Sequence, residues 1–211
     1  AQKIVDDGTP EAAVGLAELK QRAQALGVKK KKKKLKFDAV TFLKDFRRLD
    51  EGYLKDRFRD YLIGRGFRRS EVGRLSRLYR LRYAVTGPFR HRIIFPFLRK
   101  GKMVGWTGRA IVKAELRYVS FPADDVVKRL LFNSQLAERS KRKRILVVVE
   151  GPLDCLKIDF YGRRIGIRAV ALLGVSTTVQ QIVELLRVGK QFDRVVLMLD
   201  DDALARSLEM Q

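Results

Sequence analysis

The 211-residue chain has very few of the residues that build disulfides and zinc sites, with one cysteine, Cys155, and one histidine, His91. A single cysteine excludes an internal disulfide and any cysteine-rich zinc site within this chain, so we expect no zinc here and a reducing compartment. No apolar run approaches the roughly 18 residues of a membrane span, and the first residues lack the apolar core of a signal peptide. We therefore expect a soluble intracellular protein.

Acidic residues are scarce in the first 144 residues, which hold 38 Lys and Arg against 15 Asp and Glu. From Ile145 onward there are eight basic and nine acidic side chains, so the net charges of the two parts are +23 and −1. A basic field of this size concentrates phosphate and releases counterions on binding. Nucleic acid is therefore the expected partner, and an anionic membrane surface is the weaker alternative.

Proline is also rare, with five residues, and 46% of the chain is hydrophobic, which indicates a folded protein. The sequence predicts a helix from Thr9 to Leu26, and six consecutive lysines, Lys29–Lys34, favour an exposed linker after it. Apolar residues at helical spacing predict helices between Phe37 and Tyr83. The segment Phe89–Gly108 predicts a β-hairpin with its turn at Arg99–Lys102.

The last third of the chain alternates strands and helices. Short apolar runs predict strands at Ile145–Val149, Arg168–Leu173 and Arg194–Leu199, with helices at Asp154–Tyr161 and Thr177–Val188. Strands of this kind separated by helices form a parallel sheet that is covered on both faces. The sequence therefore predicts an α/β module in this part of the chain.

The helix at Thr177–Val188 carries an apolar stripe that is expected to face the core. Its members recur at i, i+3, i+4 and i+7 and are Val179, Ile182, Val183 and Leu186. Ser176 or Thr177 is the expected N-cap, because a hydroxyl there can accept a hydrogen bond from the first turn.

Acidic residues directly follow two of the predicted strands. Glu150 comes after Ile145–Val149, and the run Asp200–Asp202 comes after Arg194–Leu199. The carboxyl ends of parallel strands meet at one edge of a sheet, where ligands bind. Carboxylate oxygens favour Mg²⁺ or Mn²⁺ over zinc. Each group alone also fits a structural role, as a turn or as a helix N-cap, but together they predict a metal site.

Three segments that contain these acids resemble the Toprim signature. They are Val148–Asp154, with the sequence VVEGPLD, Leu172–Thr177, with LLGVST, and Leu199–Asp202, with LDDD. Toprim domains occur in bacterial-type primases, in type IA and type II topoisomerases, and in some nucleases and recombination proteins. These motifs alone therefore leave the reaction undecided.

Segments upstream of the acids resemble bacterial and bacteriophage primases and narrow the choice. A basic strand and a glycine-rich turn, a loop that carries a basic residue and a tyrosine, and a helix end all have counterparts in those enzymes. In this chain they are Arg90–Phe97, Gly101–Arg109, Leu116–Pro122 and Tyr61–Phe67.

The resemblance implies a mixed α/β fold, in which a basic α+β subdomain typical of primase polymerase cores precedes a Toprim parallel-sheet module. We expect an N-terminal helix and lysine-rich linker at 1–36, the basic subdomain at 37–140 and the Toprim domain at 141–211. The chain ends soon after the run of aspartates, so the Toprim domain is expected to be shorter than in the family.

The resemblance also implies an activity, which is synthesis of short RNA primers on single-stranded DNA by metal-dependent nucleotidyl transfer. The expected partners are the template, NTPs and the nascent RNA primer, with a replicative helicase as a further candidate. The expected location is the cytoplasm of a bacterial or phage-infected cell, in association with the nucleoid. Two alternatives stay open, namely a Toprim nuclease or topoisomerase-like enzyme and a non-catalytic nucleic-acid-binding module.

The expected site residues follow from the same resemblance. Glu150, Asp200 and Asp202 are the expected catalytic residues and ligands of two Mg²⁺ or Mn²⁺ ions, with Asp201 as a further ligand and Asp154 as an auxiliary acid. Basic side chains are expected to bind the nucleotide or the template, because a guanidinium grips phosphate with two hydrogen bonds and keeps its charge. They are Arg90, Arg92, Lys102, Arg109 and Arg117.

Overall fold

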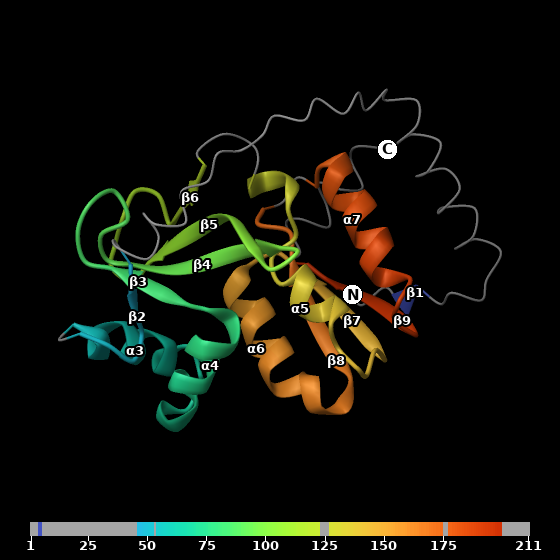
Figure 1. Cartoon of the computed structure of the whole chain (residues 1–211), viewed down its shortest axis with the longest axis horizontal. Helices are drawn as coiled ribbons and strands as arrows, with labels where there is room; N and C mark the ends of the chain where they lie inside the picture. Colours follow the sequence, from blue (N-terminus) through green and yellow to red (C-terminus); the bar gives the residue numbers. More distant parts are fainter. Residues whose placement is uncertain (1–3, 6–45, 53, 123–126, 175–176, 200–211) are drawn as a thin grey trace. The chain divides into compact units, whose positions relative to one another are not determined.

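The fold consists of two compact units, each built on its own β-sheet (Figure 1). The computed structural model describes residues 4–5, 46–52, 54–122, 127–174 and 177–199. Of these, residues 46–52 and 54–122, with Val127, form one unit, here called the hairpin unit, and the others form the second, here called the parallel-sheet unit. The domain limits expected from the sequence stay a prediction.

The parallel-sheet unit is organised around β7 (Ile145–Val149), which pairs in parallel with β8 (Ile167–Ala171) and with β9 (Arg194–Met198). Within the described residues the strand order is β1-β9-β7-β8, with β1 (Ile4–Val5) antiparallel to β9. Four of the five residues of β7 are buried. A strand covered on both faces cannot alternate apolar and polar residues, which explains its continuous apolar sequence.

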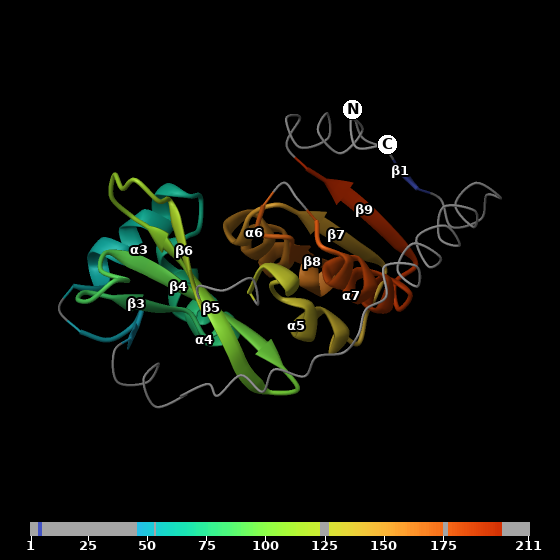
Figure 2. The ribbon, with the colours of Figure 1, turned by 90° about the horizontal axis from the view of Figure 1, so that it is seen from above.

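Helices cover the two faces of this sheet. On one face, the strand residues Leu146 and Val148 form a core cluster with Ala137 of α5 (Ser134–Glu138) and Val188 of α7 (Val179–Gly189). These two helices lie together (Figure 2). Strand side chains alternate between faces, so Val147 points to the opposite face. There α6 (Pro152–Gly162) crosses between β7 and β8 and packs against both.

The start of α6 follows from its sequence. Gly151 is the extended N-cap, and Pro152 occupies the first helical turn, where its fixed φ suits the helix and its missing N–H costs no hydrogen bond. Asp154 adds an acid to the same turn, which the partial positive charge of a helix N-terminus favours. The helix runs into the short η3 (Arg163–Ile165), and the chain then turns through Gly166 at φ 86°.

The buried face of α7 differs from the predicted stripe. Val183 is 50% exposed, whereas Gln181 and Val188 are buried. The N-cap is Thr178, whose hydroxyl accepts a hydrogen bond from the Gln181 N–H. The Gln181 amide also donates to the backbone carbonyls of Leu130 and Leu172. A polar residue whose hydrogen bonds are satisfied in this way can face the core, so the stripe predicted from hydrophobicity is wrong in this respect.

A buried ion pair joins α6 to β8. Arg168 donates from Nε and Nη2 to the two carboxylate oxygens of Asp159, at 2.7 and 3.0 Å, and both side chains are almost fully excluded from solvent. The Arg168 Nη1 donates to the carbonyl of Leu136 on α5, and the Asp159 carboxylate accepts from the Ala169 N–H. These further hydrogen bonds satisfy both charged groups, as a buried ion pair requires.

The hairpin unit contains an antiparallel sheet. Among the described residues the strand order is β2-β3-β4-β5-β6, and the strands are β2 (Arg47–Arg48), β3 (Arg82–Ala84), β4 (Arg92–Arg99), β5 (Lys102–Ala110) and β6 (Tyr118–Phe121). The predicted hairpin is β4 and β5. Its two-residue turn is Lys100-Gly101, with φ of 49° and 79°. A turn with two positive φ values matches the twist of the strands it joins.

Two helices lie between β2 and β3 in the chain. They are α3 (Lys55–Gly64) and α4 (Val72–Tyr79), with the short η1 (Arg69–Glu71) between them. The Phe58 ring of α3 stacks on the Tyr83 ring of β3, with centroids 4.4 Å apart. A separate cluster of Phe46, Ile94 and Trp106 fills the core near β4 and β5. The stacking of Phe58 on Tyr83 holds α3 beside the sheet.

The predicted class, a mixed α/β protein with a parallel sheet, is confirmed by these two sheets. The predicted helix at Thr9–Leu26 and the lysine run Lys29–Lys34 lie outside the described residues. Among the described helices, none is long and apolar enough to cross a membrane.

We expect Asp159→Asn to destabilise the parallel-sheet unit by about 3 kcal/mol, because it leaves the buried Arg168 guanidinium without its counter-charge. Urea unfolding followed by circular dichroism measures this change. Asp193→Asn is the control, since Asp193 is exposed, and it should shift the free energy of unfolding by less than about 0.5 kcal/mol. A similarly small shift for Asp159→Asn would contradict the structural role of the pair.

Candidate functional site

Glu150 lies at the carboxyl edge of the parallel sheet, directly after β7. Its backbone carbonyl accepts a hydrogen bond of 2.9 Å from the N–H of Leu173, which follows β8. This bond continues the pairing of the two strands beyond their ends and holds the backbone of Glu150 in place. The Glu150 side chain is half-buried.

The neighbouring strand β9 leaves the sheet at the same edge. Its last residue, Met198, pairs with Val149, the last residue of β7. Leu199 and Glu150 are therefore the first residues after two paired strand ends. Leu199 packs against the core of the unit. The predicted catalytic and metal-binding residues Asp200, Asp201 and Asp202 lie outside the described residues, and their roles stay predictions.

Asp154 is the second acid at the start of α6. It is exposed, and a Cβ atom added to Gly151 would lie 2.9 Å from its Oδ2 atom. The absence of a side chain at Gly151 therefore lets the Asp154 carboxylate approach the backbone that follows Glu150. Among the described residues, no group of three or more His, Cys, Asp or Glu side chains could hold a metal ion. The auxiliary role of Asp154 stays a prediction.

Cys155 is not available as a nucleophile. The thiol is fully buried on α6, and burial, with a further contribution from the Asp159 carboxylate, raises its pKa well above the usual range. The thiol therefore stays protonated at neutral pH, whereas the thiolate is the reactive form.

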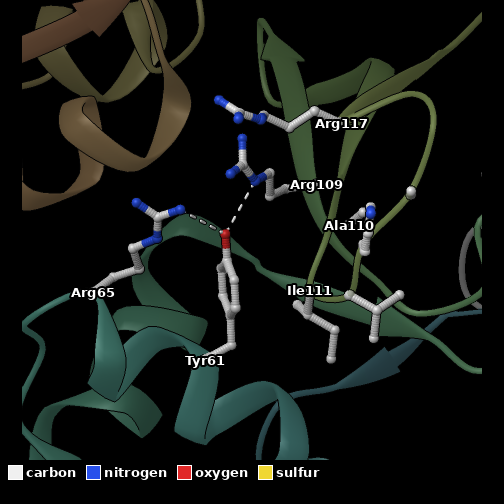
Figure 3. Close-up of a pocket in the computed structure, with 9 residues that line it drawn as sticks. Tyr61, Arg65, Arg109, Ala110, Ile111 and Arg117 are labelled. Carbon is white, nitrogen blue, oxygen red and sulfur yellow. Dashed lines mark hydrogen bonds between the residues drawn. The ribbon is translucent and has the colours of Figure 1, made fainter.

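A basic pocket lies in the hairpin unit, with a cavity volume of about 280 Å³ (Figure 3). Among the described residues, its wall includes four cationic side chains and no carboxylate. The lining residues are Tyr61, Arg65, Arg109, Ala110, Ile111, Val112, Lys113, Ala114 and Arg117. A concave surface with several fixed cations and no acid is suited to an anion, and guanidinium groups suit phosphate. The pocket brings together the predicted ligands Arg109 and Arg117.

Tyr61 connects the two sides of this pocket. Its hydroxyl oxygen accepts hydrogen bonds from the Arg109 Nε at 3.0 Å and from an Nη atom of Arg65 at 3.2 Å (Figure 3). Arg65 follows α3, whereas Arg109 is on β5, so one oxygen holds guanidinium groups from two separate elements. The Arg109 guanidinium also lies 4.9 Å from the centre of the Tyr118 ring, a favourable cation–π contact.

Arg92 does not line the pocket but holds the loop 111–117, which does. Its side chain is buried and donates to three backbone carbonyls, those of Gly108 at 3.2 Å, Leu116 at 2.9 Å and Arg117 at 3.2 Å. Burial lowers the pKa of the Arg92 guanidinium. Its donors are directed at the loop 111–117, so the geometry favours a positioning role over the direct phosphate contact predicted from the sequence.

The other two predicted basic ligands are not part of the pocket. Arg90 is exposed in the turn before β4, and Lys102 is exposed at the tip of the β4–β5 hairpin. Neither residue lines the cavity. Both can reach a nucleic-acid backbone from the surface, and this role stays a prediction.

The chain is similar in sequence to DNA primases. No family profile matches the chain. The DNA primase of Clostridium acetobutylicum is 28% identical over 187 residues, which cover 86% of this chain and 30% of that protein. The DNA primase of Staphylococcus epidermidis is 31% identical over 136 residues, which cover 63% of this chain and 22% of that protein. The chain is a homologue of the bacterial DNA primases.

Solved structures of primases share the fold. The E. coli primase catalytic core matches with a TM-score of 0.58 and 24% identity, covering 77% of this chain and 63% of that core. A DnaG primase catalytic domain bound to single-stranded DNA matches with a TM-score of 0.57 and 22% identity, covering 93% of this chain and 69% of that domain. At these identities the likeness shows the fold, which is that of a primase catalytic core. The chain spans less than a third of the length of the curated primases cited above.

Within this primase homologue, sequence reasoning missed three residues of the pocket, namely Tyr61, Arg65 and Lys113. Tyr61 and Arg65 fall in the segment Tyr61–Phe67, which resembles the helix end of primase cores. The resemblance gave no reason to single out these two side chains, because only the packing of α3 beside β5 brings them to Arg109.

We expect Arg92→Lys to loosen the loop 111–117, because a lysine cannot donate to three carbonyls in the geometry of a guanidinium. Amide hydrogen exchange in residues 110–117 should accelerate about tenfold, since one or two carbonyls lose a hydrogen-bond partner. Arg90→Lys is the matched control, because Arg90 is two residues away and exposed, and it should leave the exchange unchanged. Equal exchange rates in the two variants would show that Arg92 does not hold the loop.

Proposed function

We propose that this chain is the catalytic core of a DNA primase, which synthesises short RNA primers on single-stranded DNA by nucleotidyl transfer. The observation that carries the proposal is its homology to DNA primases over 86% of the chain. The basic pocket, lined by four cations and no carboxylate, supports it. Glu150 at the carboxyl edge of the parallel sheet supports it as well.

The proposed substrates are polyanions. A related catalytic domain was solved bound to single-stranded DNA, and the net charge of +23 on the first 144 residues suits such a template. The other proposed partners are NTPs, the nascent RNA primer and a replicative helicase. Single-stranded DNA is the partner with the most direct support.

Joining nucleotides requires a 3′-hydroxyl to attack an α-phosphate while pyrophosphate leaves. The proposed role of the pocket is to hold nucleotide phosphates, with Arg109, Arg117 and Arg65 as donors to phosphate oxygens. Donors held in place before the substrate arrives lower the barrier more than mobile ones, because they need not reorganise during the reaction. Arg92 acts on the pocket indirectly, through the backbone of the loop 111–117.

The carboxyl edge of the parallel sheet, where Glu150 lies, suits a hard divalent ion such as Mg²⁺ or Mn²⁺. Glu150 offers an oxygen ligand at the edge where β7 and β9 end together, and we propose that Asp200, Asp201 and Asp202, which follow β9 in the sequence, complete the ligand set. Two bound ions would neutralise negative charge on the attacking and leaving oxygens. Asp154 is proposed to tune the site from the first turn of α6.

A primer-synthesis assay with NTPs and a single-stranded template tests the proposal. Glu150→Gln should lower kcat on the order of 100-fold, because it removes a charged ligand of the catalytic ion. Arg109→Gln should raise KM for NTP about tenfold, because it removes a charged hydrogen-bond donor to phosphate.

Two exposed residues provide controls. Asp193→Asn alters an acid at the amino end of β9, away from the carboxyl edge, and Lys190→Gln alters a cation after α7. Both variants should synthesise primers at the normal rate. Normal synthesis by Glu150→Gln would reject the primase assignment, and cleavage of DNA in the absence of NTPs would favour a nuclease.

A further inference from the structure

We propose that Tyr61 is a positioning residue of the basic pocket, and that its hydroxyl is also a donor to the bound phosphate. The hydroxyl oxygen holds Arg65 and Arg109 side by side, which leaves its own proton for a phosphate oxygen of the nucleotide. This inference rests on the proposed function, since it takes the pocket to be a nucleotide-phosphate site.

The hydrogen-bonding capacity of a phenol carries the argument. A tyrosine hydroxyl has one proton to donate and two lone pairs that can accept. Both lone pairs of Tyr61 are engaged, one by the Nε of Arg109 at 3.0 Å and the other by Arg65 at 3.2 Å. The two guanidinium groups cannot accept a hydrogen bond, so the Tyr61 proton needs a third group.

The surroundings of the hydroxyl indicate which group that is. Among the described residues, no carboxylate lines the pocket and no hydrogen bond from the Tyr61 hydroxyl to a protein acceptor is found. Two further cations that line the cavity, Lys113 and Arg117, attract an anion to the same place. A phosphate oxygen satisfies the proton of Tyr61 and the charges of Arg65 and Arg109 together, because it accepts several hydrogen bonds.

Two guanidinium groups stay close together only if an acceptor between them offsets their repulsion, and the Tyr61 hydroxyl oxygen is that acceptor. Like charges repel, and the two side chains come from segments far apart in the sequence, since Arg65 follows α3 and Arg109 is on β5. A neutral oxygen that accepts from both brings them together before the ligand arrives. Arg109 is fixed further by burial, with 9% of its surface exposed, and by the ring of Tyr118. The pocket is therefore organised in advance, which lowers the entropic cost of binding.

Binding of inorganic tripolyphosphate, measured by isothermal titration calorimetry, tests the role of the hydroxyl. Tyr61→Phe keeps the ring, and with it the contact of Arg65 with the ring face, but removes the oxygen. We expect it to weaken binding about tenfold, the loss typical of a hydrogen bond to a charged group. Tyr161→Phe is the matched control, because Tyr161 is a half-exposed tyrosine at the far end of α6, and it should bind as tightly as the wild type.

A double-mutant cycle separates positioning from a general loss of structure. If Tyr61 acts through Arg109, Tyr61→Phe should cost less than about threefold in the background of Arg109→Gln, since interacting residues are not additive. A cost of tenfold in both backgrounds would overturn the positioning role. If Tyr61→Phe fails to fold, Arg65→Gln provides the same cycle with Arg109→Gln, and equal costs in both backgrounds would again overturn the proposal.

The experiment also distinguishes this inference from the proposed function. Weak binding by Arg109→Gln together with normal binding by Tyr61→Phe would reject the role of Tyr61 and leave the phosphate pocket intact. Normal binding by Arg109→Gln would reject the phosphate pocket itself, and the role of Tyr61 with it.

Discussion

Strand β7 forms parallel ladders with β8 and with β9 along its whole length, and the register pairs Val149 with Ala171 on one side and with Met198 on the other. Because the three strands run in the same direction, their carboxyl ends form one edge. Glu150 is therefore positioned by backbone hydrogen bonds before any side-chain interaction is considered. The buried ion pair of Arg168 and Asp159 holds α6 against this frame, and the core cluster that contains Val188 holds α7.

In the hairpin unit the constraint is electrostatic, because several arginine side chains lie close together in and around the basic pocket. Elsewhere in this unit arginines pair with carboxylates, as Arg69 does with Asp60, but the acceptors described at the pocket are neutral. Backbone carbonyls of the loop 111–117 accept from Arg92, and the hydroxyl of Tyr61 accepts from Arg65 and Arg109. Neutral acceptors orient the guanidinium groups without cancelling their charge. A pocket built in this way keeps its positive charge, which internal ion pairs would have reduced.

Much of the fold was predictable because local patterns determine it. The run ILVVV at Ile145–Val149 and the turn Lys100-Gly101 have the structures that their sequences indicate. The face of α7 was not predictable in the same way. Gln181 is buried because the carbonyls of Leu130 and Leu172 accept its hydrogen bonds. Leu130 is 51 residues away in the sequence, and Leu172 lies before the helix begins. Hydrophobic periodicity contains no information about such partners.

The candidate site also has features that the sequence predicts and features that only the tertiary structure reveals. The sequence by itself determined that an acid follows β7, that the first 144 residues carry a net charge of +23, and that Arg109 and Arg117 belong to a primase-like pattern, since residue type and spacing are local properties. Only the tertiary structure decided that Arg92 serves the loop 111–117 and that Tyr61 joins α3 to β5. These roles depend on which donor meets which acceptor across 24 to 48 residues, and chain folding alone brings those groups together.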